Sequence, residues 1–99
     1  MKEFKIKISG ADFTVKQSYR SLMLFEELTG INLSDMNGSV THTIKLFYCM
    51  VKGCNMNTFN YSFDEFMTIL DEEPEMLDSF NAYLISESKP SEKKKMKKV

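Results

Sequence analysis

The chain begins with two short runs in which apolar and polar residues alternate at a period of two. The first run is Phe4-Lys5-Ile6-Lys7-Ile8, the second is Phe13-Thr14-Val15-Lys16, and Ser9-Gly10-Ala11-Asp12 lies between them as a turn. This pattern predicts an antiparallel β-hairpin with one polar and one apolar face. Because a lone hairpin is not stable in water, helices must cover the apolar face. The residues predicted on that face are Phe4, Ile6, Ile8, Phe13 and Val15.

About four helices are predicted after the hairpin, and the first runs from Tyr19 to Thr29. Ser18 is suited to the N-cap and Gly30 to a left-handed C-cap. Apolar residues recur at helical spacing, which predicts a stripe that faces the core. The stripe consists of Tyr19, Leu22, Phe25 and Leu28, widened by Met23 and Leu24.

A second helix is predicted from Ser39 to about Lys52, where Gly53 would end it. Its expected core stripe is Val40, Ile44, Phe47 and Val51. Further apolar residues leave little polar surface on its second half, and such a helix is either buried on several sides or faces a partner. We predict a partner-binding surface on this helix, with core packing as the alternative. Its candidate residues are Leu46, Tyr48 and Met50.

Two shorter patterns complete the predicted domain. Ser62-Phe63-Asp64-Glu65 has the form of a capping box and opens a third helix. Pro74 fits the first turn of a fourth helix, whose apolar pattern stops after Ser86. The inward residues of these helices are predicted to be Phe63, Phe66, Met67 and Leu70, then Met76, Leu77, Phe80, Tyr83 and Leu84. The expectation is one α+β domain over residues 1–87, followed by a flexible lysine-rich tail over residues 88–99.

Composition limits where such a chain works. A length of 99 residues with 42% apolar residues suits one folded domain. No apolar run is long enough to span a membrane, and the N-terminus lacks the apolar stretch of a secretion signal. Two cysteines do not form a secreted disulfide framework. We therefore expect a cytoplasmic protein with reduced thiols and no membrane contact.

Charge is distributed unevenly along the chain. Residues 1–88 hold 7 Lys/Arg against 13 Asp/Glu, a net charge of −6, whereas residues 89–99 hold 6 Lys against 1 Glu, a net charge of +5. Any contact with a polyanion should therefore use the tail. Base recognition is not expected, because neither arginine nor an aromatic residue accompanies these lysines. The tail lysines considered are Lys93, Lys94, Lys95, Lys97 and Lys98.

The sequence contains no arrangement that is typical of an active site. His42, Cys49 and Cys54 supply only three of the four ligands of a structural zinc site. The acidic residues from Asp71 to Asp78 are near-consecutive and flank a helix start, where negative charge is favoured by the helix dipole. With only 4 glycines, no phosphate-binding loop is present. We predict no catalytic residue, no metal, no cofactor and no enzymatic activity.

The order of these segments resembles the tail assembly chaperones of long-tailed bacteriophages and of prophages derived from them. The matching segments are Phe25-Glu26-Glu27-Leu28-Thr29-Gly30 with Leu33, then Leu46-Phe47-Tyr48-Cys49-Met50-Val51, and Ser62-Phe63-Asp64-Glu65-Phe66. They follow a hairpin, as in the family, and the resemblance covers roughly residues 3–86. Most of this pattern is apolar spacing and capping chemistry.

The resemblance implies a non-enzymatic protein in the bacterial cytoplasm that binds the tape measure protein and helps recruit tail tube subunits. Its 8 Met and 8 Phe residues suit an adaptable apolar surface, and a homo-oligomer is left open. Because many of these genes undergo a programmed frameshift near their end, Lys93-Lys94-Lys95 is a candidate for slippery coding. A solvated tail without a role and a polyanion contact are the alternatives. The second reading of the whole chain is a small regulatory or nucleic-acid-associated protein that uses its basic tail.

Overall fold

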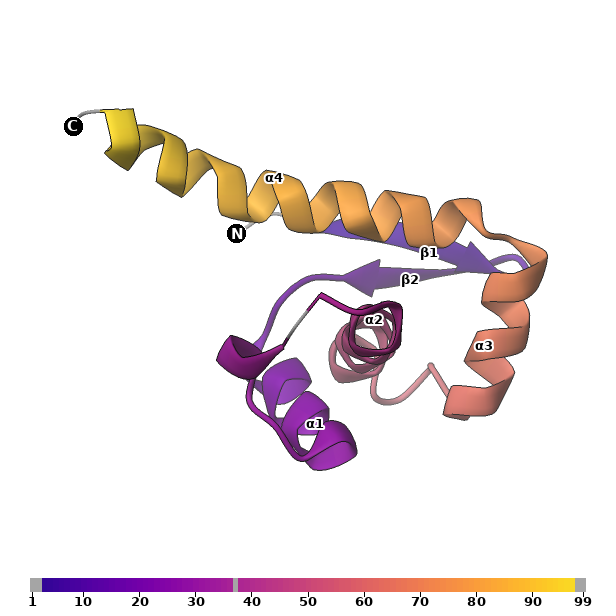
Figure 1. Ribbon diagram of the computed structural model, residues 1–99. Coiled ribbons are helices and arrows are strands. Elements are labelled where there is room, and N and C mark those ends of the chain that lie inside the picture. Colours follow the sequence, from indigo (N-terminus) through magenta and orange to yellow (C-terminus); the bar gives the residue numbers. More distant parts are fainter. Residues whose placement is uncertain (1–2, 37, 98–99) are drawn as a thin grey trace.

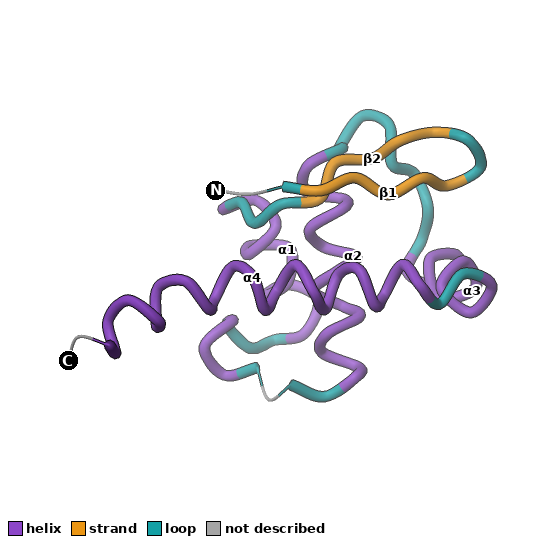
Figure 2. The backbone as a smooth tube through the Cα atoms, turned by 90° about the horizontal axis from the view of Figure 1, so that it is seen from above, coloured by secondary structure: helices purple, strands orange, loops and turns teal. Residues whose placement is uncertain are grey.

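The computed structural model describes residues 3–36 and 38–97, with side chains described for residues 3–32, 34–36 and 38–86. It has an α+β fold, as the sequence predicts. The elements are β1 (Phe4–Ile8), β2 (Ala11–Val15), α1 (Tyr19–Thr29), a 3-10 turn (Leu33–Asp35), α2 (Val40–Cys54), α3 (Phe63–Glu72) and α4 (Glu75–Lys97). Figure 1 shows α2 at the centre, with the hairpin and α4 on one side, α1 on the other and α3 at one end. From above, α4 crosses α2 (Figure 2).

The predicted hairpin is confirmed, with a shorter turn than expected: Ala11 and Asp12, predicted in the turn, belong to β2, which ends at Val15. β1 and β2 pair antiparallel, and the register places Ile8 opposite Ala11. Ser9 and Gly10, which connect them, have φ values of 52° and 84°, the left-handed backbone that a tight two-residue hairpin turn requires. On the polar face, Lys7 and Asp12 lie opposite each other and form an ion pair of 2.9 Å.

The core is centred on the ring of Phe47, in the middle of α2. This ring stacks on Phe80 of α4 with a centroid distance of 4.4 Å, and the edge-to-face contact with Phe66 of α3 measures 5.1 Å. Phe4 of β1 lies 6.5 Å from the same ring. Because Phe47 is fully buried, these contacts join one strand and three helices around a single side chain.

Asn55 fastens the hairpin to the end of α2. Its Nδ2 donates to the carbonyl oxygens of Thr14 and Val51, both at 2.8 Å, and its Oδ1 accepts from the backbone N–H of Thr14 at 3.3 Å. The amide thus satisfies backbone groups on the edge of β2 that faces away from β1. One side chain therefore holds the hairpin in register against α2.

The face of α1 that packs on α2 differs from the predicted one. Ser21 and Phe25 are the fully buried residues of α1, whereas Tyr19 is 87% exposed and Leu28 40% exposed. The reason is a close crossing of the two helices: a Cβ atom added to Gly53 would lie 2.5 Å from Ser21 Oγ and 3.0 Å from Ser21 Cα. Only small residues allow this approach, so the serine rather than the tyrosine turns inward.

The helix ends test the predicted caps. Ser18, Ser39 and Ser62 cap α1, α2 and α3 through their side chains, and Gly30 adopts the predicted left-handed C-cap with a φ of 80°. Gly53, predicted to end the second helix, instead lies inside α2, which continues to Cys54. Val40, predicted in the core stripe, is 68% exposed because it lies in the first turn of α2, beyond the core.

The fourth helix is longer than predicted. The sequence pattern ends at Ser86, whereas α4 continues to Lys97 and its last turns extend past the other elements (Figures 1 and 2). The lysines and glutamates of this stretch are good helix formers, whereas Pro90 within it opposes a helix. The side chains of residues 87–97 and all of residues 98–99 lie outside the described part, so the predicted flexible tail stays a prediction. Within residues 3–36 and 38–97, none of the helices has the length and apolarity needed to span a membrane.

The crossing at Gly53 leads to a first prediction. Gly53→Ala should lower the free energy of unfolding by about 1–3 kcal/mol, because the added Cβ forces the two helices apart. This loss should occur although alanine normally favours a helix over glycine by about 1 kcal/mol. Chemical denaturation measures the change. Ser21→Ala in the same chain removes the nearest atom and should restore part of the loss. A Gly53→Ala protein as stable as the wild type would contradict the close crossing.

Candidate protein-interaction surface

The three α2 residues predicted to face a partner are buried by their own chain. Leu46 is 4% exposed, Tyr48 9% and Met50 1%, and the Tyr48 hydroxyl donates to the carbonyl oxygen of Tyr61 at 2.9 Å. This corrects the expectation that these side chains are exposed. The hairpin and the other helices surround α2, so its apolar perimeter is used for core packing, the alternative that the sequence left open.

The predicted tail site lies outside the described side chains. Lys93, Lys94, Lys95 and Lys97 belong to the backbone of α4 without a described side chain, and Lys98 follows the last described residue. The polyanion contact and the slippery-coding hypothesis therefore both stay predictions.

The cysteines and the histidine occupy separate settings. Burial raises the pKa of the Cys49 thiol to about 12, against a smaller opposing influence of Lys52, so Cys49 is a neutral thiol at physiological pH. Cys54 donates from Sγ to the carbonyl oxygen of Lys16 at 3.3 Å, and the ring of His42 packs edge-to-face on Phe25. Among the described residues, no group of three His, Cys, Asp or Glu side chains is placed to hold a metal ion.

The exposed apolar side chains gather on α1. In the described part of the chain, the large exposed apolar residues are Tyr19, Met23, Leu28, Val40, Met56 and Ile85. Half of them belong to α1, a helix of only 11 residues. Exposed apolar area that is concentrated on one short element is typical of a surface that binds another protein.

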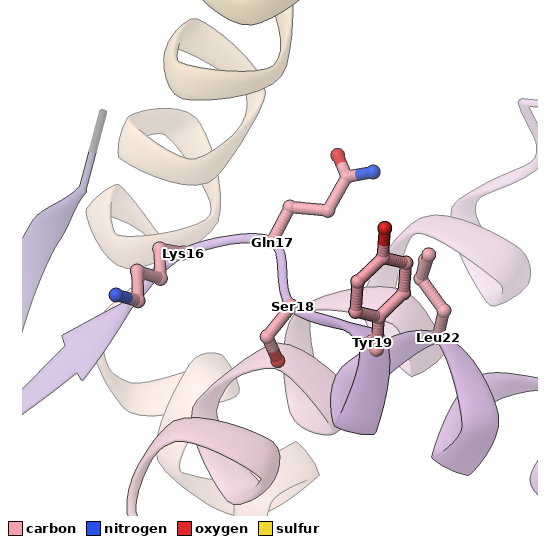
Figure 3. A pocket seen from close by; sticks show the side chains of 5 residues that line it. All are labelled: Lys16, Gln17, Ser18, Tyr19 and Leu22. Atoms are coloured by element: carbon pink, nitrogen blue, oxygen red, sulfur yellow. The ribbon is translucent and has the colours of Figure 1, made fainter. Parts of the chain in front are cut away.

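One part of this exposed apolar surface lies at the N-terminal end of α1. Figure 3 shows Tyr19 and Leu22 side by side at the pocket, with Gln17 near them; Tyr19 is exposed and Leu22 is half-buried. Together with Lys16 and Ser18 they line an open pocket of about 480 Å³. Met23 follows Tyr19 by four residues, so it continues the same exposed face one turn further along the helix.

The other part of this exposed apolar surface is a groove between α1 and α2. It measures about 290 Å³, and its lining residues are Leu24, Glu27, Leu28, Tyr48, Cys49 and Lys52. We call these six residues the α1–α2 groove. Tyr48 and Cys49 contribute although they are buried overall, so one predicted α2 residue does border the exposed region.

Charged groups surround the apolar atoms unevenly. Lys52 Nζ lies 6.0 Å from the centroid of the Tyr48 ring, within range of a cation–π contact. The exposed carboxylates of Glu26 and Glu27 have no ion-pair partner among the described residues. We define the α1 surface as Tyr19, Leu22, Met23, Glu26 and Glu27; Arg20, a cation in the first turn of the same helix, is also exposed.

Sequence reasoning missed the α1 surface because it assigned every apolar residue of this helix to the core. A signal was present: the apolar residues from Tyr19 to Leu28 surround more of the helix than one buried face requires. A similar excess of apolar residues on α2 led to the prediction of a partner-binding surface there. Deciding between the two helices requires knowing which one is central, and that is a property of the tertiary structure.

The region supplies apolar side chains, an aromatic ring and carboxylates, which suit binding to another polypeptide. Comparisons of this chain with protein-family models, with curated proteins and with solved structures find no match. The function is therefore inferred from the residues and their arrangement.

The buried thiol beneath the groove leads to a prediction about pH. The folded-state pKa of Cys49, about 12, lies above its ordinary value of 9.0. The neutral buried thiol therefore contributes fully to folding stability below pH 9.0, and this contribution is lost as the pH rises to about 12. The melting temperature should therefore fall between about pH 9 and about pH 12, and fall less in Cys49→Val.

Met50→Ala is the matched control for this measurement. It removes a neighbouring buried side chain without a titratable group, so it should cost about 2–5 kcal/mol of stability at every pH and keep the wild-type pH slope. An unchanged pH slope in Cys49→Val would show that burial of this thiol is not the cause. A negligible stability loss in Met50→Ala would contradict its place in the core.

Proposed function

We propose that this protein is a non-enzymatic tail assembly chaperone of a long-tailed phage or prophage, which binds the tape measure protein and helps recruit tail tube subunits. Two arguments support the proposal. Residues 3–86 resemble this family in the order of hairpin, capped helices and apolar segments. The observation that carries the proposal is the α1 surface, where Tyr19 and Met23 are 87% and 60% exposed beside a fully packed core.

The physical demands of the proposed task agree with this surface. A chaperone for a long, helical and aggregation-prone protein must present apolar groups without aggregating itself. Methionine and tyrosine are suited to this, because methionine adapts to different shapes and tyrosine keeps a polar end. Residues 3–86 carry 12 Asp/Glu against 6 Lys/Arg, and this net negative charge favours solubility.

Co-expression with the tape measure protein encoded in the same phage or prophage genome tests the proposal. The wild type should raise the soluble fraction of the tape measure protein and co-purify with it. Tyr19→Ser with Met23→Ser should reduce both effects several-fold, because these substitutions remove exposed apolar area. Since the two side chains are exposed, the melting temperature should remain close to that of the wild type.

Val40→Ser with Met56→Ser is the matched control, because these apolar side chains are 68% and 46% exposed but lie outside α1. This variant should support the tape measure protein as the wild type does. A wild type that neither solubilises nor co-purifies with the tape measure protein would refute the proposed function. Salt-sensitive DNA binding that requires residues 89–99 would favour the nucleic-acid alternative instead.

A further inference from the structure

We infer that the α1 surface and the α1–α2 groove together bind one amphipathic helix whose apolar residues are flanked by lysine or arginine. The inference rests on the proposed function in that it names the kind of tape measure segment that is bound. It depends on the shape, the length and the charge of the region, which are independent of the family resemblance.

The size of the groove favours a single side chain as its occupant. Its volume of about 290 Å³ is at the lower limit of small-molecule sites. Leu24 and Leu28 form one wall, and Tyr48 with Cys49 forms the other side. A large apolar side chain from a partner would find apolar atoms on both sides, as an anchor residue does at the centre of a protein interface.

The length and spacing of the region favour a helix as the element that carries this side chain. At 1.5 Å per residue, the 11 residues of α1 extend over about 16 Å, or three turns. Tyr19, Met23 and Glu27 follow one another at intervals of four, which forms the ridge that a second helix packs against. The partner would therefore contribute about three turns.

Charge specifies the flanks of that helix. The carboxylates of Glu26 and Glu27 are exposed and have no ion-pair partner in the described segments, and the last turn of α1 contains no basic residue. The carbonyl groups at a helix C-terminus add negative potential at the same end. Two cations lie near these residues: Lys52 of α2 lies over the Tyr48 ring, and Arg20 is exposed in the first turn of α1. The partner should thus place its basic residues near the C-terminal end of α1 and its apolar residues near Tyr19 and Met23.

Two fluorescein-labelled synthetic helical peptides test this inference. They share one leucine pattern at helical spacing, and their flanking residues are all lysine in one and all glutamate in the other. Fluorescence anisotropy with the full chain should show the lysine peptide binding at least about tenfold more tightly. Glu26→Lys with Glu27→Lys should remove this preference, and Tyr19→Ser with Met23→Ser should weaken binding of the lysine peptide by about tenfold.

Glu72→Lys with Glu73→Lys is the matched charge control. It changes the net charge by the same amount at two exposed positions at the end of α3. Binding of the lysine peptide should change less than about twofold in this variant. Equal losses in both charge variants would show attraction by the net charge alone and would overturn the inference. Equal binding of the two peptides to the wild type would also overturn it.

The inference and the proposed function fail in different ways. The same measurement is repeated with overlapping peptides of the tape measure protein. If the synthetic lysine peptide binds at α1 but no tape measure peptide does, the inferred site stands and the proposed function fails. If tape measure peptides bind equally to wild type and α1 variants, the function stands and the site is wrong. Self-association that Tyr19→Ser with Met23→Ser abolishes would identify a second copy as the occupant and overturn the inference.

Discussion

The stacking of Phe47 on Phe80 is the contact on which the rest of the arrangement depends. Their centroids lie 4.4 Å apart, and the same Phe47 ring also contacts Phe66 and Phe4. α2 must therefore be apolar around most of its perimeter, because strand β1 and helices α3 and α4 all meet it at this ring. The apolar second half of α2 is explained by its central position, without a partner.

The central position of α2 leaves α1 at the periphery. α1 packs mainly on α2, through Phe25 and through the close approach of Ser21 to Gly53. Ser21 and Phe25 are the residues of α1 that are buried in this arrangement, so its tyrosine and methionine remain on the outer side. A surface with apolar groups is thus a consequence of how the two helices fit. Glu26 and Glu27, which have no ion-pair partner among the described residues, add negative charge beside it.

The features that could be predicted from sequence are those set by local chemistry. The existence of the hairpin follows from its alternation, although its turn is shorter than the predicted Ser9–Asp12 segment. The Ser62–Glu65 capping box follows from side-chain chemistry within four residues. The orientation of α1 was predicted wrongly, because a stripe spaced by three residues drifts around the helix and places Tyr19 about 120° from Phe25. Gly53 was predicted to end the second helix, but it lies inside α2. Its close packing against Ser21, a residue distant in sequence, cannot be recognised from local sequence. The sequence therefore predicted the interaction surface on α2, whereas the exposed apolar side chains lie mainly on α1.

Site-specific photocrosslinking in cells that produce the tape measure protein would show whether α1 is the surface that binds it. A photoreactive amino acid replaces Tyr19 or Met23 on α1, or Val40 or Met56 elsewhere, four side chains that are all exposed in the structure. We expect irradiation to join the tape measure protein to the chain from the two α1 positions and not from the other two. Crosslinks from Val40 and Met56 alone, or equal crosslinks from all four positions, would contradict this expectation.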